Sequence, residues 1–187
     1  MKLILGSASP RRLELLAQAN ITPHSINPAN IDESPRRREL PLEYCRRMAL
    51  EKASSLSIKK GEIILTADTT VSVGRRILGK PIDVNEAEEF LTLLSGRRHK
   101  VITAITGRNS TDVKVISVVS QVKFKRLSIN EMNRYLKSKE WEGKAGGYAI
   151  QGLGSEFIPW ISGSYSGIVG LPLSQTISLL KSLGWKQ

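Results

Sequence analysis

Apolar and polar positions along the chain alternate in blocks that switch between the spacing of strands and the spacing of helices. Short apolar runs predict strands, and apolar residues three or four positions apart predict helices. The predicted strands cover residues 2–5, 63–67, 71–73, 76–78, 101–106 and 113–125. The predicted helices cover residues 10–19, 42–56, 85–94, 128–137 and 172–183, with Ser128 as the cap of the fourth. Strands and helices in alternation predict an α/β protein.

Two segments between these elements predict loops. Residues 27–38 are polar, contain prolines and carry two neighbouring acids, Asp32 and Glu33. Residues 143–154 are rich in glycine and lack helical spacing.

The start of the first predicted helix breaks a local rule. Ser9 is expected as the N-cap and Pro10 as the first helical residue, so Arg11 and Arg12 fall in the first turn. A cation there is disfavoured by roughly 0.3–1 kcal/mol, because the helix N-terminus is itself positive. Either both side chains extend into solvent, or both converge on an anion bound at the helix N-terminus. The local sequence leaves both interpretations open.

Composition narrows the class of protein. The 187 residues carry a formal net charge of +11, which favours polyanionic partners and makes a nucleic-acid-binding module a rival hypothesis. The basic residues are scattered, however, and no run of aromatic residues is interleaved with them. The chain lacks an apolar stretch of transmembrane length and a signal-peptide core, so a cytoplasmic protein without a membrane partner is expected.

Cysteine and histidine usage excludes two kinds of site. The single cysteine, Cys45, excludes an intramolecular disulfide and a cysteine metal cluster, and a buried structural thiol is its expected role. His24 and His99 lie far apart in the sequence and lack the spacing of zinc ligands.

Several polar residues lie where a core or a tight loop is predicted. Asp68 follows the apolar run ILTA, and an acid at the end of a buried strand either contacts a ligand or caps a turn. Lys52 borders the apolar stripe of its helix, so it either snorkels to solvent or points into a cleft. Lys80, next to Pro81, is surface by default, and so is Lys144.

One combination of charges among these residues points to phosphate chemistry. Cations for phosphate oxygens, together with carboxylates for a divalent metal, form the minimal set for cleaving a nucleoside triphosphate. The cations are Arg11, Arg12, Lys52 and Lys80, and the carboxylates are Glu33 and Asp68. The sequence by itself does not show that they converge.

Seven motifs then occur in a recognisable order. They are S-x-S-P-R-R from Ser7, I-D-E at residues 31–33, A-D-T at 67–69, G-K-P at 79–81, S-G-R-x-H at 95–99, G-K-A-G-G-Y-x-I-Q-G at 143–152 and G-S-Y-S-x-I-V-G-L-P at 163–172. Together they closely resemble the Maf family of nucleoside triphosphate pyrophosphatases. The resemblance spans nearly the whole chain.

The resemblance implies a fold and a reaction. The fold is α/β and inosine-triphosphatase-like: an elongated mixed β-sheet with flanking helices, forming two lobes around a central cleft. Residues 1–187 would form one Maf-like domain, and the protein would be a homodimer. The reaction converts a nucleoside triphosphate to the monophosphate and pyrophosphate with Mg²⁺, Mn²⁺ or a similar divalent cation.

The resemblance also implies roles for individual residues. Ser7, Arg11 and Arg12 would bind the triphosphate, and Lys52 and Lys80 would neutralise charge that develops on it. Glu33 and Asp68 would hold the metal and the attacking water, with Asp68 as the general base.

The glutamine of the glycine-rich motif bears on the substrate. Gln151 is typical of the members that prefer dTTP and UTP, because its amide both donates to and accepts from a uracil or thymine edge. It also fits a loop residue that satisfies backbone groups. We therefore expect a house-cleaning pyrophosphatase for dTTP, UTP and modified pyrimidine nucleotides, without a stable nucleic-acid partner. The alternatives are a pyrophosphatase for 7-methyl-GTP or other noncanonical purine nucleotides, and a non-catalytic nucleic-acid-binding or cell-division regulatory protein.

Overall fold

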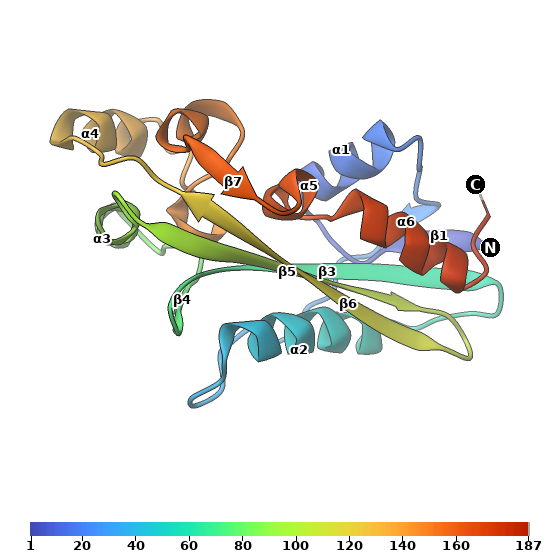
Figure 1. Ribbon diagram of the computed structural model, residues 1–187. Coiled ribbons are helices and arrows are strands. Elements are labelled where there is room, and N and C mark those ends of the chain that lie inside the picture. Colours follow the sequence, from blue (N-terminus) through green and yellow to red (C-terminus); the bar gives the residue numbers. More distant parts are fainter. Residues whose placement is uncertain (187) are drawn as a thin grey trace.

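The central feature of the computed structural model, which describes residues 1–186, is a mixed seven-stranded sheet of order β2-β1-β3-β5-β6-β7, with β4 paired to β3 (Figure 1). The strands are β1 (Lys2–Leu5), β2 (Ser25–Ile26), β3 (Glu62–Val73), β4 (Arg76–Leu78), β5 (Arg98–Arg108), β6 (Val113–Lys123) and β7 (Trp160–Ser162). The helices are α1 (Pro10–Gln18), α2 (Pro41–Ser54), α3 (Val84–Leu94), α4 (Ile129–Lys137), α5 (Tyr165–Val169) and α6 (Leu173–Ser182), and two 3₁₀ turns are η1 (Ala145–Gly147) and η2 (Gly152–Phe157).

The long strands β3, β5 and β6 pair antiparallel and give the molecule its elongated shape (Figure 1). Helix α2 covers one face of these strands, and α1, α5 and α6 lie on the other side, with α3 and α4 at one end (Figure 1). Strand β1 pairs parallel with both β2 and β3, which makes the sheet mixed. The expected α/β fold with an elongated mixed sheet and flanking helices is confirmed.

Two apolar clusters occupy the two ends of the long strands. One contains Leu65 and Ala67 of β3 packed with Leu179 of α6, and the other contains Val71 of β3 packed with Phe90 of α3. Strand β3 runs from the first cluster to the second, so its central residues lie between two cores.

The middle of β3 has an unpaired edge. Strand β1 pairs with residues 62–65 of β3, and β4 pairs with residues 71–73. Strand β5 occupies the opposite edge along residues 64–72. Residues 66–70 therefore have no strand neighbour on the β1 side within residues 1–186, and the sheet is open there.

The position predicted for Asp68 was wrong. It lies in the middle of β3 and not at the end of a strand, because the two predicted strands 63–67 and 71–73 form one 12-residue strand. Thr69 and Thr70 continue the pairing with Thr103 and Ile102 of β5 without a break. Threonine suits a half-buried strand, so the polar run Asp68–Thr70 does not form a turn.

Several short elements were not predicted. Strands β2 and β7 and helix α5 comprise two, three and five residues, too few to show a period. Ser9 occupies the predicted N-cap of α1, but its side chain makes no capping hydrogen bond; its own N–H donates to Ser7 Oγ at 3.3 Å. Among the helices of residues 1–186, none has both the length and the apolar character needed to cross a membrane.

Candidate functional site

A cavity of about 710 Å³ opens at the unpaired edge of β3. Its wall is built from the start of α1, the loop before α2, the centre of β3, the segment after β4 and the glycine-rich segment 143–151. All eight residues predicted for the site line it: Ser7, Arg11, Arg12, Glu33, Lys52, Asp68, Lys80 and Gln151. A cavity of this size suits a small-molecule ligand.

At one end of the cavity a lysine joins two carboxylates. Lys52 Nζ lies 2.8 Å from Asp68 Oδ1 and 2.8 Å from Glu33 Oε1. Thr70 Oγ1 donates to the other oxygen of Asp68 at 3.1 Å. Lys52 and Asp68 are buried, and a buried charge is tolerated only when it is paired and hydrogen-bonded. We call Glu33, Lys52 and Asp68 the carboxylate end of the cavity. Of the two interpretations of Lys52, the cleft-directed one is correct.

The fold supplies this end from three directions. Asp68 comes from β3, and Lys52 comes from α2, which packs through Cys45 and Ala49 onto Ile102 and Ala104 of β5. Glu33 comes from the loop before α2, where its backbone carbonyl accepts a hydrogen bond of 2.8 Å from Tyr44 Oη. A helix, a strand and a tethered loop therefore fix the positions of the three charges.

Cys45 lies directly beneath the carboxylate end. Its thiol is buried and points at the backbone carbonyls of Asp68 and Ile102, at 3.4 and 3.3 Å. Burial raises the pKa of the Cys45 thiol to about 12, and the nearby Asp68 charge adds to this effect. The thiol is therefore protonated at neutral pH, as expected for a structural residue.

The two arginines of α1 have different surroundings. Arg12 donates from Nε to the Gly170 carbonyl at 3.0 Å, and from its terminal nitrogens to Ser7 Oγ at 2.9 Å and Thr69 Oγ1 at 3.4 Å. Arg11 is partly buried beside the cavity, and within residues 1–186 its guanidinium has no hydrogen bond or ion pair. Burial lowers the pKa of both guanidinium groups. Neither side chain simply extends into solvent, so that interpretation was wrong.

Arg12 belongs to a chain of hydrogen bonds that runs from α1 over β3 and β5 to α5. Thr69 Oγ1 lies 3.1 Å from Thr103 Oγ1, which donates to the Gly167 carbonyl at 2.7 Å. Gly170 has φ = 137°, a conformation that L side chains rarely adopt. The motif at residues 163–172 therefore serves the site through its backbone carbonyls, and a role of backbone atoms cannot be read from side-chain types alone.

At the other end of the cavity, glycines shape the wall. Gly146 and Gly147 have φ of 72° and 69°, in the left-handed region that favours glycine. The Gly146 N–H donates to the Gly79 carbonyl at 2.8 Å, which ties this segment to the loop that carries Lys80. A Cβ on Gly146 would lie 2.8 Å from the Val71 side chain. We call Lys144, Tyr148 and Gln151, which all line the cavity here, the glycine-rich end.

Lys144 is the residue that sequence reasoning missed. It was expected to be an ordinary surface lysine, but it lines the cavity. Burial lowers the pKa of Lys144, and the positive charge of Arg11 lowers it further. Two cations held near each other against a cavity favour an anion between them. Its place inside the G-K-A-G-G-Y motif was the available signal.

The residues present suit a metal ion that arrives with phosphate oxygens. Glu33 and Asp68 supply two carboxylates, and among the described residues His, Cys, Asp and Glu form no group of three or more suited to metal binding. Mg²⁺ is usually held by one or two carboxylates together with substrate phosphates and water. This donor set fits that pattern and not an all-protein cage.

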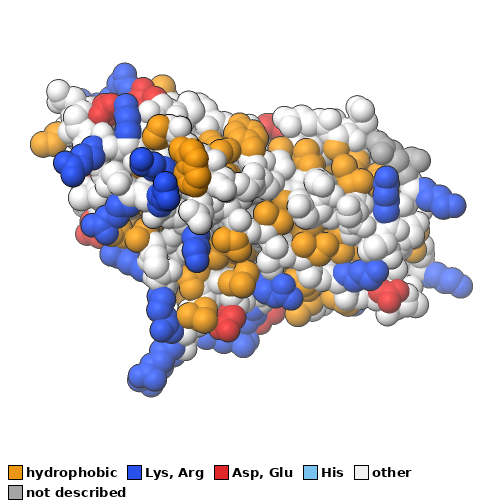
Figure 2. All heavy atoms as spheres, in the orientation of Figure 1, with side chains coloured by type: hydrophobic (Ala, Val, Ile, Leu, Met, Phe, Trp, Pro, Cys, Tyr) orange, Lys and Arg blue, Asp and Glu red, His pale blue; other side chains and the backbone are white. Residues whose placement is uncertain are grey.

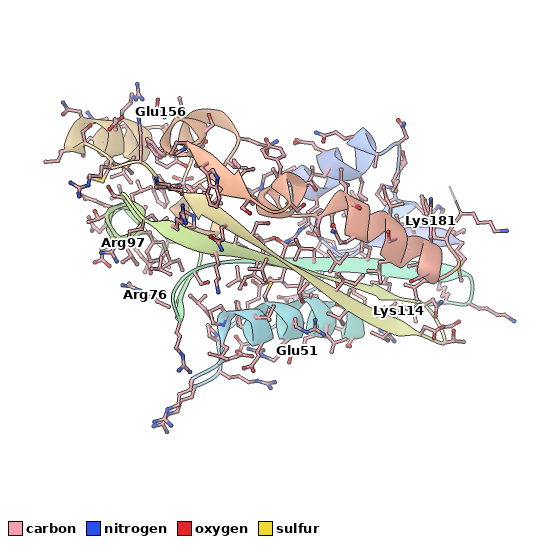
Figure 3. The ribbon with its side chains drawn as sticks, viewed as in Figure 1. Glu51, Arg76, Arg97, Lys114, Glu156 and Lys181 are labelled. Atoms are coloured by element: carbon pink, nitrogen blue, oxygen red, sulfur yellow. The ribbon has the colours of Figure 1, made fainter. Side chains whose placement is uncertain are left out.

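The remaining positive charge is dispersed. Figure 2 shows Lys and Arg side chains singly or in small groups across the visible face, with a concentration at one end. In Figure 3, Arg76, Arg97, Lys114 and Lys181 lie on the periphery, away from the centre of β3. The cationic residues that line the cavity are thus distinct from these peripheral surface cations.

Comparison with known proteins gives close relatives along the full length. The chain is 62% identical to a protein of Cereibacter sphaeroides named dTTP/UTP pyrophosphatase, over 98% of this chain and 96% of that protein. It is 56% identical to a protein of the same name from Ruegeria sp., over 99% and 96% of the two chains. Among solved structures, that of a HAM1 protein from Coxiella burnetii is similar at a TM-score of 0.46 and 15% identity, covering 68% of this chain and 74% of that chain.

The family described as Maf-like protein matches residues 2–183, and with these relatives it establishes that the chain belongs to the Maf family.

Proposed function

We propose that the protein hydrolyses dTTP and UTP to the nucleoside monophosphate and pyrophosphate in the cavity beside β3. The observation that carries this proposal is the meeting of Arg11, Lys52 and Lys80 with Glu33 and Asp68 in one cavity. Relatives that are 62% and 56% identical over nearly the full chain bear the name dTTP/UTP pyrophosphatase, which supports the substrate.

The charge of the cavity suits a polyanion. Its wall contains five cationic side chains and two carboxylates, a net charge of +3. The cationic residues are Arg11, Arg12, Lys52, Lys80 and Lys144. Because the walls exclude part of the solvent, these charges attract phosphate more strongly than the dispersed surface cations do.

Asp68 is our proposed general base. Lys52 and Thr70 each hold one of its oxygens, so the carboxylate has a fixed orientation. It takes a proton from the attacking water while the water oxygen bonds to phosphorus and the anhydride bond between the α- and β-phosphates breaks. Pyrophosphate then leaves with the bonding electrons.

The cations stabilise the charge that moves onto the leaving group. Arg11 and Lys80 face the cavity, and we assign them to the phosphate oxygens, with Ser7 and Arg12 shaping the wall beside them. Lys52 holds Glu33 and Asp68 in place and adds positive charge near the reacting phosphorus. A divalent cation, when bound, supplies Lewis-acid chemistry and lowers the pKa of water, and Glu33 and Asp68 are the residues that would hold it.

Gln151 is our proposed reader of the base. It lines the glycine-rich end of the cavity, and its side-chain amide offers both a hydrogen-bond donor and an acceptor. Uracil and thymine present both groups on one edge, so modified pyrimidines that keep this edge are expected substrates as well. The homodimer and the single-domain organisation implied by the family resemblance remain predictions.

The experiment is pyrophosphate release from dTTP, UTP, CTP, the purine triphosphates and 7-methyl-GTP, with Mg²⁺ or Mn²⁺. Asp68→Asn tests the site. The matched control is Asp112→Asn, which makes the same change at an exposed aspartate outside the cavity. We expect turnover of dTTP and UTP that Asp68→Asn lowers by about 10²–10⁴-fold and the control does not change.

Other outcomes would redirect the proposal. Turnover of 7-methyl-GTP in place of UTP would keep the chemistry and overturn the base assignment. No turnover of any nucleotide, together with nucleic-acid binding that weakens steeply with salt, would support the binding-protein alternative.

A further inference from the structure

His99 is a buried histidine that has no role in the proposed reaction. It lies on β5, is 3% exposed and does not line the cavity. Its Nε2 lies 2.7 Å from Tyr148 Oη, and its ring meets Phe124 and Tyr148 edge to face, with centroids 5.1 and 5.4 Å apart. Among the described residues, the one hydrogen bond of the His99 ring is therefore to a residue that does line the cavity.

Packing alone does not account for a histidine at this position. Nδ1 of His99 is buried and has no hydrogen-bond partner among the described residues. A buried polar atom without a partner costs about 1–3 kcal/mol, a cost that phenylalanine or leucine of similar size would avoid. The hydrogen bond to Tyr148 is the feature that only a polar ring supplies here.

His99 is neutral at physiological pH. Burial lowers its pKa to about 4. One ring nitrogen then donates and the other accepts, so the contact with Tyr148 is a neutral hydrogen bond and involves no ion pair. A neutral ring outside the cavity is placed to hold a neighbour and not to exchange protons with a substrate.

The segment that His99 holds is one that needs external anchors. Gly146, Gly147 and Gly152 all have positive φ, and glycine allows the backbone many conformations. Contacts from three other elements restrict it: the Gly146 N–H donates to the Gly79 carbonyl at 2.8 Å, and the Ala149 N–H donates to Tyr135 Oη at 3.3 Å. The third is the His99 contact, which fixes the Tyr148 side chain.

Gln151 follows Tyr148 by three residues, across a bend at Ile150 and Gln151. Tyr148 and Gln151 both have extended backbone angles, and Gln151 is the N-cap residue of η2. Beyond it, Glu140 accepts hydrogen bonds from the N–H groups of Leu153 and Gly154, at 2.9 and 3.3 Å. The backbone at Gln151 is thus held by anchors on both sides, and of these only Tyr148 lines the cavity.

We propose that His99 is a positioning residue for base selection: its hydrogen bond to Tyr148 fixes the stretch that presents Gln151 to the nucleobase. The inference rests on the proposed function, because it takes Gln151 as the reader of the base. It assigns a role to the S-G-R-x-H motif, which contributes no residue to the cavity wall.

The test measures the dissociation constants of UTP and CTP by calorimetry in EDTA, so that its readout does not depend on turnover. The variants are His99→Phe, His99→Gln, Tyr148→Phe and the double variant His99→Phe/Tyr148→Phe. Loss of one hydrogen bond is expected to lower the preference for UTP over CTP by about three- to tenfold in both Phe single variants. The glutamine amide reaches roughly where Nε2 lies, so His99→Gln should restore most of the preference.

The double variant separates positioning from general destabilisation. If both residues act through one hydrogen bond, it should lose no more preference than either single variant. Effects that multiply, an unchanged preference in the folded Phe variants, or no recovery with glutamine would each overturn the inference. A wild-type protein that binds UTP in preference to CTP but does not hydrolyse it would overturn the proposed function. The effect of the His99 variants on binding preference could still be interpreted in that case.

Discussion

The two ends of the cavity are built in different ways. At the carboxylate end, charged side chains from α2, β3 and a loop pair directly, with Lys52 Nζ 2.8 Å from both Glu33 and Asp68. At the glycine-rich end, the side chains of Tyr148, Gln151 and Lys144 line the cavity, and the positive-φ residues Gly146 and Gly147 set the course of the backbone. The first end consists of two side chains on a helix and a strand and one on a loop tethered by Tyr44, and the second consists of a chain segment held by its neighbours.

This difference assigns a task to each end. Chemistry at phosphorus needs charges at fixed positions, and rigid elements supply that precision. Discrimination between bases needs donors and acceptors that match one edge of a ring, and a backbone segment anchored at several points presents them. Substitutions at the carboxylate end should therefore change the rate, and substitutions at the glycine-rich end should change the preference.

The largest effect outside Asp68 is expected at Lys52. Lys52→Met leaves the buried Asp68 and the more exposed Glu33 without their shared cation, and removing one partner of a buried ion pair such as Lys52–Asp68 typically costs about 3–5 kcal/mol. We expect a lower midpoint of thermal unfolding and a loss of turnover. Added Mg²⁺ should raise the midpoint of Lys52→Met more than that of the wild type, because a divalent cation can take the place of the ammonium group.

The control for this substitution is Lys60→Met, an exposed lysine outside the cavity. Equal stabilisation of Lys52→Met and of the wild type by Mg²⁺ would show that Lys52 does not occupy the neighbourhood of the metal.

A smaller effect should separate the two arginines of α1. Arg11→Met removes a cation that has no protein partner among residues 1–186, so KM for UTP should rise about ten- to a hundredfold with little loss of stability. Arg12→Met leaves Ser7, Thr69 and the Gly170 carbonyl without their donor, so it should lower the free energy of unfolding by about 1–3 kcal/mol. Urea unfolding and steady-state kinetics check both. The distinction fails if Arg11→Met unfolds as readily as Arg12→Met does.

The smallest effect concerns Cys45 and pH. Its pKa is raised to about 12 in the folded protein, above the usual value of about 8.5 in an unfolded chain. The folded state therefore holds the thiol proton more tightly, and its contribution to stability is complete below about pH 8.5 and is lost as the pH rises toward 12. Cys45→Ala should show a smaller fall of stability over this range than the wild type. Rapid alkylation of the native thiol at pH 8 would contradict the raised pKa.

Much of the fold followed from the sequence because long amphipathic or apolar segments dominate it. The principal helices and long strands show their period clearly, whereas β7 and α5 are too short to do so. The position of Asp68 was misjudged because an acid followed by two threonines reads locally as a turn. Pairing with β5 decides otherwise, and that information is not local.

The site shows the same division. Motif resemblance named eight residues, and the structure brings all eight to one cavity. It could not separate Arg11 from Arg12, because adjacent identical residues differ only in what surrounds them after folding. It also passed over Lys144, which lines the same cavity as Arg11 because the glycine-rich segment folds against β3 and the loop after β4.

The most direct test of the two-ended account compares Asp68→Asn with Gln151→Leu on the same two nucleotides, UTP and CTP. Turnover is measured by pyrophosphate release, and dissociation constants are measured by calorimetry. The account predicts that Asp68→Asn loses turnover of UTP but still binds UTP more tightly than CTP, whereas Gln151→Leu keeps measurable turnover and loses the preference. An Asp68→Asn protein that remains active, or a Gln151→Leu protein that still selects UTP, would contradict it.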